Sequence, residues 1–305
     1  QAVIVPGLKF SDTLRFEAGF GYRMDDPQVN NAEKDEQWSA YLQAMISCGF
    51  KGQLYPVNPK GGEVMGLKVY PSVRDIPGPV DYVISAIPAS GALQLTKDCV
   101  AKGVLAMHFF TSGFSELGKG EGIALEREIL ALARDHGMRV VGPNCMGVYC
   151  PGSGVSFLAD LTSESGPVGA ICQSGGNAIY LAREAVRRGV RFSKVISYGN
   201  ASDVNETDLM DYMADDPETG IIMAYIEGVR DGPRFMKALE RAARRKPVIV
   251  LKVGITESGA RAAASHTGSL AGADRVWDGV LEQVNAVRVA TIEEWIDMAV
   301  TFTFF

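Results

Sequence analysis

Short apolar runs alternate with longer stretches of helix-forming residues along most of the chain, and this alternation limits the fold more than any other feature. We expect strands at residues 2–5, 53–57, 82–86, 104–110, 139–141, 168–172, 194–198, 221–226, 247–253 and 286–289. We expect helices at residues 36–48, 91–102, 123–136, 177–188, 206–213, 232–244, 276–282 and 292–302. Short apolar strands that alternate with helices predict an α/β fold, in which a parallel sheet is covered by helices on both faces.

Proline and glycine divide this series into two halves. They gather at residues 150–154 and again at residues 165–167, between the fifth and the sixth expected strands. The length of 305 residues also suits two domains, since a domain has about 100–200 residues. The sequence therefore predicts two doubly wound parallel-sheet domains, at residues 1–150 and 151–305, of which the second is of the flavodoxin type.

The composition excludes several classes of protein. The formal net charge is -6, so the chain has no overall positive field that would attract nucleic acid. No stretch reaches the ~18 consecutive apolar residues of a membrane span, and the first apolar run is too short for a signal peptide. The five cysteines are scattered and the three histidines lie far apart, which predicts neither a disulfide framework nor a zinc site. We expect a cytoplasmic protein that binds neither nucleic acid nor membranes.

Doubly wound sheets bind their ligands in the loops that follow the carboxyl ends of the strands. The loop at residues 56–62 contains two prolines, two glycines and Lys60, which can attract a phosphate, although the same residues also form an ordinary rigid turn. The loop after the first expected strand lacks the GxGxxG spacing, which argues against an NAD-dependent oxidoreductase. Cys145 has no histidine nearby in the sequence, so we interpret it as a structural thiol.

The second half carries two sharper signals at strand ends. Free N–H groups and the helix dipole bind anions where a strand leads into a helix. Such a junction is formed by Gln173, Ser174, Gly175 and Gly176. The alternative is that Ser174 only caps the helix. Glu227 lies at the exit of another apolar strand, either as a solvated charge or as a group that orients an active-site base.

The strongest single feature is His266, which lies in the run AAASHTGSLAG at residues 262–272. Small neighbours leave room for a bulky group on the imidazole and allow the loop to move. A lone histidine is usually structural or solvated, but neutral imidazole is also a good nucleophile near pH 7. A phosphohistidine needs a nearby anion site and a carboxylate that fixes the ring tautomer, which residues 173–176 and Glu227 can provide.

Taken together, these motifs resemble the NDP-forming acyl-CoA synthetases, the superfamily that includes the succinyl-CoA synthetase α subunit, and most of all its ADP-forming acetate–CoA ligase branch. The resemblance extends from residue 49 to the C-terminus and rests on GFKGQLYPVNPK, DYVISAIPA, TSGFSELG, GPNCMG, ICQSGG, IEG and SHTGSLAG. It implies a Rossmann-like CoA-binding domain followed by a flavodoxin-like ligase domain. It also implies an enzyme that makes or uses an acyl-CoA thioester through an acyl phosphate and a phosphohistidine.

The resemblance implies a role for individual residues wherever the motifs match. His266 would be the phosphorylated residue and Glu227 the glutamate that holds it. The phosphate would be bound by Gln173, Ser174, Gly175 and Gly176. The coenzyme A site would include Lys60, a wall formed by Ile87 and Pro88, and the matching residues Asn58, Ser112, Gly113 and Asn144. No metal ligands are implied in this chain, because ATP or GTP and Mg²⁺ would be bound by an ATP-grasp module.

The chain departs from the family pattern in two places. The family has a Gly-Ala-Ser-type loop after its first strand, where this sequence has Pro6, Gly7, Leu8 and Lys9 and then a long polar segment. Neither an ATP-grasp module nor a second α-type domain is visible before residue 305. We therefore expect a partner domain or subunit, in a homo- or hetero-oligomer, with the apolar residues 301–305 as a contact surface.

Two further classes of function compete with the ligase. The chain could be the CoA-binding regulatory half of a multidomain protein, such as a ligase-like acyltransferase, or a structural subunit that supports another catalytic chain. Such regulatory halves often lack the histidine, so the presence of His266 favours the enzyme. The carboxylic acid substrate and the choice between ATP and GTP stay open.

Overall fold

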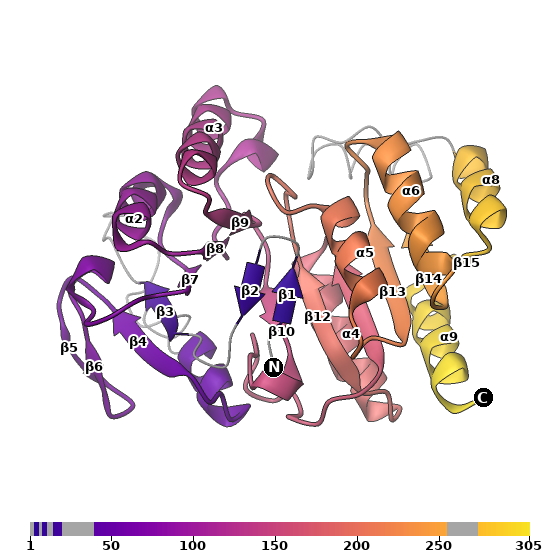
Figure 1. Ribbon diagram of the computed structural model, residues 1–305, viewed down its shortest axis with the longest axis horizontal. Helices are drawn as coiled ribbons and strands as arrows, with labels where there is room; N and C mark the ends of the chain where they lie inside the picture. Colours follow the sequence, from indigo (N-terminus) through magenta and orange to yellow (C-terminus); the bar gives the residue numbers. More distant parts are fainter. Residues whose placement is uncertain (1–2, 6–7, 11–14, 20–39, 255–273) are drawn as a thin grey trace.

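The computed structural model describes residues 3–5, 8–10, 15–19, 40–254 and 274–305, and two sheets lie side by side in it (Figure 1). The first sheet has five parallel strands in the order β4-β3-β7-β8-β9. Their bounds are β3 Arg15–Gly19, β4 Gln53–Val57, β7 Tyr82–Ser85, β8 Ala106–Phe109 and β9 Arg139–Val141. Numbered along the chain, the order is 2-1-3-4-5, the doubly wound arrangement with a reversal of strand order between β3 and β7.

The prediction that the strand at residues 2–5 belongs to this parallel sheet was wrong. β1 (Val3–Val5) pairs in an antiparallel register with β2 (Leu8–Phe10) and forms a separate two-stranded sheet. Only Pro6 and Gly7 separate the two strands, and these residue types favour a tight reversal of the chain. The position between β4 and β7 belongs to β3, so the segment that follows β1 does not follow a strand of the large sheet.

The second sheet has six strands in the order β10-β12-β11-β13-β14-β15. Their bounds are β10 Gly147–Tyr149, β11 Val168–Cys172, β12 Phe192–Ser197, β13 Ile221–Ile226, β14 Val248–Lys252 and β15 Val287–Val289. Without β10, the order along the chain is again 2-1-3-4-5 and all pairs are parallel. β10, which the sequence analysis did not expect, adds an antiparallel edge strand. The predicted fold of two doubly wound α/β units is thereby confirmed.

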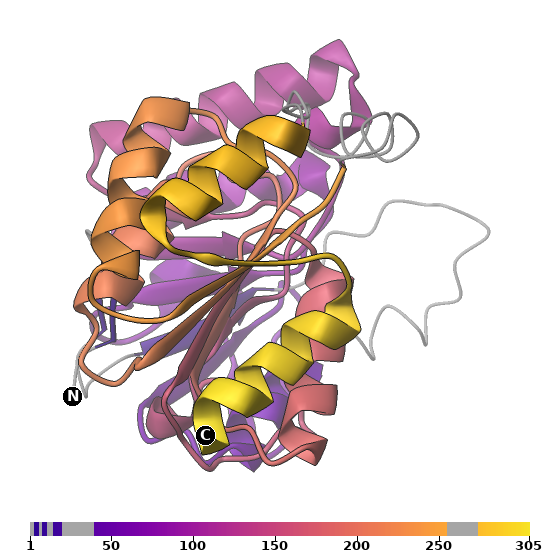
Figure 2. The ribbon, with the colours of Figure 1, turned by 90° about the vertical axis from the view of Figure 1, so that its right-hand side faces the viewer.

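Helices cover the second sheet on both faces (Figure 2). α4 (Gly175–Arg187) and α9 (Ile292–Phe304) pack together on one face, while α5 (Glu206–Asp215) and α6 (Gly232–Ala243) pack together on the other, with α8 (Asp274–Val284) beside α6. α5 begins with a capping box, in which the Asn205 side chain accepts from the Asp208 N–H group and the Asp208 carboxylate accepts in return. Such caps fix where a helix begins after a strand exit.

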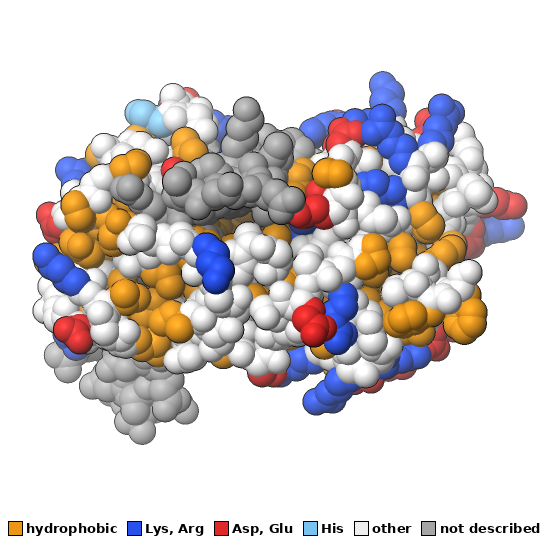
Figure 3. All heavy atoms as spheres, turned by 60° about the horizontal axis from the view of Figure 1, so that its bottom comes forward, with side chains coloured by type: hydrophobic (Ala, Val, Ile, Leu, Met, Phe, Trp, Pro, Cys, Tyr) orange, Lys and Arg blue, Asp and Glu red, His pale blue; other side chains and the backbone are white. Residues whose placement is uncertain are grey.

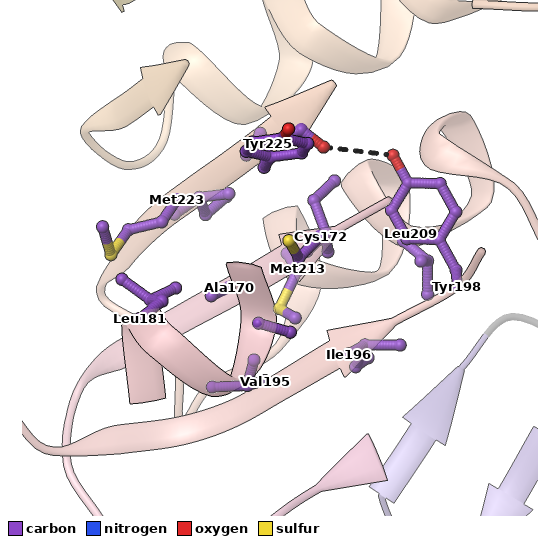
Figure 4. Close-up of a cluster of buried hydrophobic side chains, with 14 of the residues drawn as sticks. Ala170, Cys172, Leu181, Val195, Ile196, Tyr198, Leu209, Met213, Met223 and Tyr225 are labelled. Carbon is purple, nitrogen blue, oxygen red and sulfur yellow. Dashed lines mark hydrogen bonds between the residues drawn. The ribbon is translucent and has the colours of Figure 1, made fainter. Parts of the chain in front are cut away.

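The core of the second sheet consists of large apolar side chains (Figure 4). They come from three central strands and from α4 and α5, and include Ala170, Cys172, Leu181, Val195, Ile196, Leu209, Met213, Met223 and Tyr225. Each fully buried side chain of the size of leucine or methionine contributes ~1.5–3 kcal/mol. This core holds the carboxyl ends of β11, β12 and β13 in fixed positions, which is what a binding site at that edge requires.

One of two buried hydrophobic clusters is shared by the two sheets. α2 (Ala89–Lys102) and α3 (Gly120–Asp135) cover one face of the first sheet, around Val83 and Met107. On its other face Tyr82 and Ile84 pack with Tyr41, from the helical residues 40–47, in a buried cluster that continues into the second sheet. The relative position of the two carboxyl edges is therefore fixed by buried side chains.

The remaining elements are short. β5 (Gly62–Val64) and β6 (Leu67–Val69) form a hairpin, and single turns of 3-10 helix are η1 (Val73–Asp75), η2 (Ser115–Leu117) and η3 (Pro151–Ser153). Hydrophobic side chains are visible on the right of the face in Figure 3, the side on which α9 ends, where Phe304 and Phe305 are exposed. Across the described ranges, no helix combines the length and the hydropathy that a bilayer crossing needs.

Candidate functional site

The reversal of strand order in the second sheet places two of the predicted motifs next to each other. β11 and β13 pair directly, so the residues that follow them leave the sheet at neighbouring points of the carboxyl edge. Gln173 follows β11 and Glu227 follows β13. The Oε1 atom of Gln173 accepts hydrogen bonds from the Glu227 N–H group at 2.9 Å and from the Gly228 N–H group at 3.2 Å. The structure thus joins two residues that lie 54 positions apart in the sequence.

A second buried side chain holds the same peptide from the other side. Lys252, the last residue of β14, is 2% exposed, and its Nζ atom donates to the Glu227 carbonyl oxygen at 2.9 Å. The same ammonium group also donates to the Val253 carbonyl and lies 5.5 Å from the centre of the Trp277 ring. Gln173 and Lys252 come from the strands on either side of β13, so both the N–H and the C=O group of Glu227 are held by buried side chains.

The start of α4 offers backbone N–H groups at the same edge. Ser174 is the N-cap residue, and its hydroxyl accepts from the Asn177 N–H group at 3.3 Å, so the capping role considered for it is present. A Cβ atom on Gly175 would lie 3.3 Å from the Met146 side chain, whereas one on Gly176 would meet nothing within 4 Å. At Gly176 the described residues therefore leave this helix start uncrowded, and the positive end of the helix dipole lies at the same edge.

The electrostatics of this edge are set by burial and by carboxylates. Burial raises the pKa of Tyr198 well above its usual value, and the nearby charges of Glu206 and Glu227 raise it further. The Tyr198 hydroxyl is at 3.5 Å from the Tyr225 carbonyl oxygen (Figure 4). Burial also raises the pKa of Glu206, which accepts from the Arg230 N–H group at 3.2 Å. The Tyr198 phenol therefore keeps its proton at neutral pH.

The first sheet brings its predicted residues to the corresponding edge. The Thr111 hydroxyl donates to the Ile87 carbonyl at 2.6 Å, and the Asn144 N–H group donates to the Thr111 carbonyl at 3.1 Å. A Cβ atom on Gly113 would lie 3.1 Å from Ala89. The loops after β7, β8 and β9 are therefore tied to one another, while the side chains of Pro88 and Ser112 stay exposed.

The loop after β4 lies at the outer strand of this sheet. The Asn58 side chain accepts from the Lys60 N–H group at 3.0 Å, which uses its oxygen within the turn. Lys60 itself is exposed. The structure therefore gives Asn58 a role in the shape of the loop and leaves the Lys60 ammonium group accessible to an anion.

The other polar groups singled out in the sequence have simpler positions. Cys145 is buried, and burial raises the pKa of its thiol to about 12, so it stays protonated and unreactive, as a structural thiol does. All five cysteines are free and buried, which confirms that they form no disulfide framework. His266 lies outside the described residues. Among the residues that are described, no group of three or more His, Cys, Asp and Glu side chains is arranged to hold a metal ion.

Sequence reasoning missed three residues of this edge. Lys252 interrupts the apolar run of β14, and a charge at the end of a buried strand is a signal that could have pointed to it. Asn200 lies in the loop after β12, and Glu206 begins α5 at the end of that loop. We did not interpret this loop, although it holds polar residues at a strand exit as the other loops do. All three residue types are usually exposed, but here their side chains are buried at the carboxyl edge.

Two families match the chain in sequence, one for each sheet. A CoA binding domain matches residues 32–151, and a succinyl-CoA ligase like flavodoxin domain matches residues 165–302. Together they cover both carboxyl edges and all the residues described above, including Glu227 and Gln173. The two matches follow the order of the two sheets along the chain, although β3 lies before the first match and β10, a strand of the second sheet, lies within it.

Relatives and solved structures are similar over most of the chain. The α subunit of acetate–CoA ligase [ADP-forming] I from Pyrococcus furiosus is 40% identical over 265 residues, which is 85% of this chain and 57% of the relative. The 4-hydroxybutyrate–CoA ligase [ADP-forming] of Nitrosopumilus maritimus is 34% identical over 280 residues, which is 90% of this chain and 40% of the length of that relative.

A solved structure gives the same result. The dinucleotide forming acetyl-coenzyme A synthetase 1 of Ca. Korarchaeum cryptofilum, in complex with phosphate and ADP, superposes with a TM-score of 0.81 at 36% identity. The match covers 93% of this chain and 60% of the chain of that structure. This chain thus spans about half the length of such relatives. With both domain families, these relatives and this fold in common, the chain belongs to the NDP-forming acyl-CoA synthetase superfamily.

Proposed function

We propose that this chain is the core of an NDP-forming acid–CoA ligase, with His266 as the residue that carries the phosphoryl group. The observation that carries the proposal is the geometry at the strand reversal of the second sheet. There the open start of α4 lies beside Glu227, whose main chain is held by Gln173 and Lys252. A carboxylate that extends from a fixed main chain, next to helix N–H groups, is the arrangement that a phosphorylated imidazole needs.

Each residue of the second edge has a separate task in this proposal. The N–H groups of Gly175 and Gly176 bind the phosphate, for which the open space in front of Gly176 leaves room. Ser174 contributes its cap, which fixes the first turn of the helix. Gln173 positions Glu227 through its Oε1 atom and retains its amide NH₂ group as a donor toward the anion. Glu227 accepts one ring N–H group of His266, so that the other nitrogen is the nucleophile.

The reaction proceeds through one exchange at carbon and two at phosphorus. In the thioester-consuming direction, phosphate attacks the thioester carbonyl, the C–S bond breaks, and an acyl phosphate and the free thiol are formed. An imidazole nitrogen of His266 then attacks phosphorus, and the carboxylate leaves as the free acid. The phosphohistidine passes its phosphoryl group to ADP or GDP. The same steps in reverse make the thioester.

The edge of the first sheet is the site that we assign to coenzyme A. Lys60 offers an accessible ammonium group for a phosphate of the cofactor, and Asn58 shapes its loop. Ile87, Pro88, Ser112, Gly113 and Asn144 lie on the three loops that hydrogen bonds tie together. We take residue 150 as the approximate division between this domain and the ligase domain, although β10 precedes it and pairs with the second sheet.

The nucleotide and its Mg²⁺ belong to another module in this proposal. The Pyrococcus furiosus relative is named an α subunit, and this supports an ATP-grasp domain or subunit as the partner. A small carboxylic acid is the other substrate. The relatives named above are ligases or synthetases, which favours an enzyme over the regulatory CoA-binding module considered from the sequence.

The test is a product balance on the full-length protein with its nucleotide-binding module. ATP, Mg²⁺, coenzyme A and a panel of aliphatic, dicarboxylic and aromatic acids are supplied, and thioester, nucleotide and phosphate are measured. We expect thioester, ADP and phosphate in equal amounts with at least one acid, or GDP if GTP is used. Formation of AMP and pyrophosphate, or no loss of free thiol with any acid, would contradict the proposal.

A further inference from the structure

The loop after β12 connects the two carboxyl edges. Gly199 has a φ of +52°, and a Cβ atom there would lie 2.1 Å from the Pro143 carbonyl oxygen, so only glycine fits. The next residue, Asn200, donates its N–H group to the Pro143 carbonyl at 3.0 Å. Ser202 donates its N–H group to the Gly142 carbonyl at 3.2 Å. A loop of the ligase domain is therefore fixed against the strand exit of β9 in the CoA-binding domain.

The side chain of Asn200 reaches further into the first domain. It is 3% exposed, and its Nδ2 atom donates to Glu116 Oε2 at 2.6 Å and to Glu126 Oε2 at 3.3 Å. One carboxamide thus holds two carboxylates that would otherwise repel each other. Its Oδ1 atom has no partner within the described part of the chain, although it is buried. An unpaired buried acceptor costs stability, so packing alone gives no reason for asparagine at this position.

The two carboxylates in turn hold the loop that we assign to coenzyme A. Glu116 accepts from the Gly113 N–H group and from the Phe114 N–H group at 3.1 Å. Burial works against the ionised form of Glu116, but the hydrogen bonds from Asn200 and from this loop outweigh it and lower the pKa of the carboxyl. Glu126 accepts from the Ser115 hydroxyl at 2.8 Å. The backbone of residues 113–115 is therefore positioned by carboxylates that Asn200 ties to the other domain.

On the opposite side, Asn200 contacts the carboxyl edge of the second sheet, which we call the phosphate edge because the proposed phosphate site lies there. The Arg230 side chain donates through Nη2 to the Asn200 carbonyl oxygen at 2.9 Å. Arg230 follows Glu227 by three residues, after the exit of β13. A continuous series of contacts therefore leads from the loop of Gly113, through Glu116 and Asn200, to the segment that carries Glu227.

From this series of contacts we infer that Asn200 is a positioning residue that sets the coenzyme A loop of the first domain relative to the phosphate edge of the second. The inference rests on the proposed function, because only the thioester step uses both edges. The thiol must meet an acyl phosphate at the phosphate edge, and a displacement of about 1 Å in such a step costs on the order of 100-fold in rate. Phosphoryl transfer to His266 uses the second edge alone and does not depend on the coenzyme A loop.

The test compares two reactions of the full-length protein and its Asn200→Ala variant. One is the CoA-dependent formation of thioester from an acyl phosphate, and the other is phosphorylation of the protein by the same acyl phosphate without coenzyme A. We expect the rate of the first reaction to be about 10-fold or more lower in the variant than in wild type. The rate of the second reaction should differ by no more than about 2-fold. Ser193→Ala is the control for loss of a buried hydrogen bond, since Ser193 bonds to Val168 and Thr219 at the amino end of the second sheet and contacts neither edge. It should leave the ratio of the two rates unchanged.

A paired substitution keeps the inference testable if Asn200→Ala folds poorly. Asn200→Asp removes the donor and adds a third carboxylate beside Glu116 and Glu126, so it should lower the CoA-dependent rate more than the alanine. When Glu116→Gln is added, the new amide at position 116 can donate to the new carboxylate at position 200, so the hydrogen bond is restored with donor and acceptor exchanged. The CoA-dependent rate of this double variant should be at least about 3-fold higher than that of Asn200→Asp alone. Equal loss of both reactions, or no rescue, would overturn the inference. A wild-type protein that is not phosphorylated at all would instead overturn the proposed function and the inference with it.

Discussion

The two sheets have the same strand order and the same kind of edge, yet the two edges are built differently. At the first edge, hydrogen bonds between the loops, and from residues 113–115 to Glu116 and Glu126, fix the main chain, while the side chains of Lys60, Pro88 and Ser112 stay exposed. At the second edge buried polar side chains, Gln173 and Lys252 among them, hold the peptide of Glu227. An exposed rim suits a long ligand that binds over a wide area, whereas a buried polar frame suits a small anion and a reaction that needs exact placement. The fold alone does not decide between these uses, and the burial of the side chains at each edge does.

Glu227→Gln should have the largest effect and should be confined to the second edge. The amide keeps the shape of the side chain but cannot hold a cationic or tautomerically fixed imidazole, so phosphorylation of the protein should fall about 10²–10⁴-fold. Coenzyme A binding should not change. The measurement is the rate of labelling with radioactive phosphate, with the exposed Glu240→Gln on α6 as the control. Equal labelling rates in wild type and variant would remove Glu227 from the site.

A buried histidine in the first sheet should make the stability of the protein sensitive to acid. His108 is fully buried in β8 of the first sheet, and burial lowers its pKa from 6.5 to about 4. Between these values the unfolded chain binds a proton that the folded chain does not, so stability is lost as the pH falls. The loss that His108 causes between pH 7 and pH 5 should be about 2 kcal/mol. Urea unfolding of wild type and His108→Gln at both pH values measures it, and an equal loss in the two proteins would contradict it.

Lys252→Met should separate positioning from stability. Removing the donor to the Glu227 carbonyl should lower the phosphorylation rate about 10–30-fold, because the glutamate loses one of the two groups that hold its peptide. Methionine has a similar volume, but it leaves the buried Glu227 and Val253 carbonyls without this donor, so the free energy of unfolding should also fall by about 1–3 kcal/mol. The rates are therefore compared at a temperature at which both proteins stay folded. Lys252→Arg should recover part of the rate because it restores a buried cationic donor. An unchanged rate in folded Lys252→Met would show that Lys252 serves stability alone.

Lys60→Ala should have the smallest effect and should act on the first edge alone. Loss of an exposed positive charge should raise the KM for coenzyme A about 10-fold and leave kcat unchanged, since the charge binds the ground state and the transition state equally. Lys51, exposed just before the amino end of the same strand, is the matched control, and Lys51→Ala should leave both constants unchanged. An equal effect of the two variants would show that coenzyme A does not use this edge.

Most of the fold could be predicted from the sequence, because buried parallel strands are short apolar runs and the loops between them are rich in glycine and proline. The strands of the second sheet from β11 to β15 all lie within or close to their expected ranges. The failures have local causes. A Pro-Gly pair favours a hairpin at β1 and β2, and β3 contains Arg15 and Glu17, which mask its pattern. The antiparallel strand β10 has only three residues and no turn signal that distinguishes it from a loop.

The candidate site could be predicted only where a motif marks it. Glu227 and the helix start at Ser174 stood out because each follows an apolar strand directly. Lys252 and Asn200 did not, because their importance comes from burial and from partners distant in the sequence. Asn200 meets Glu116 across 84 positions, and no spacing rule connects them. Hydrogen bonds between strand exits follow from the strand order, which the sequence did not give in full.

The most direct test of the central claim is to identify the phosphorylated residue. The full-length protein is incubated with ATP and Mg²⁺, and the label is characterised by its stability to acid and base and by mapping of the labelled peptide. We predict a phosphate that is labile in acid and stable in base, on the peptide that contains His266, and no label in His266→Ala. A label that persists in this variant, or that maps to another residue, would contradict the account.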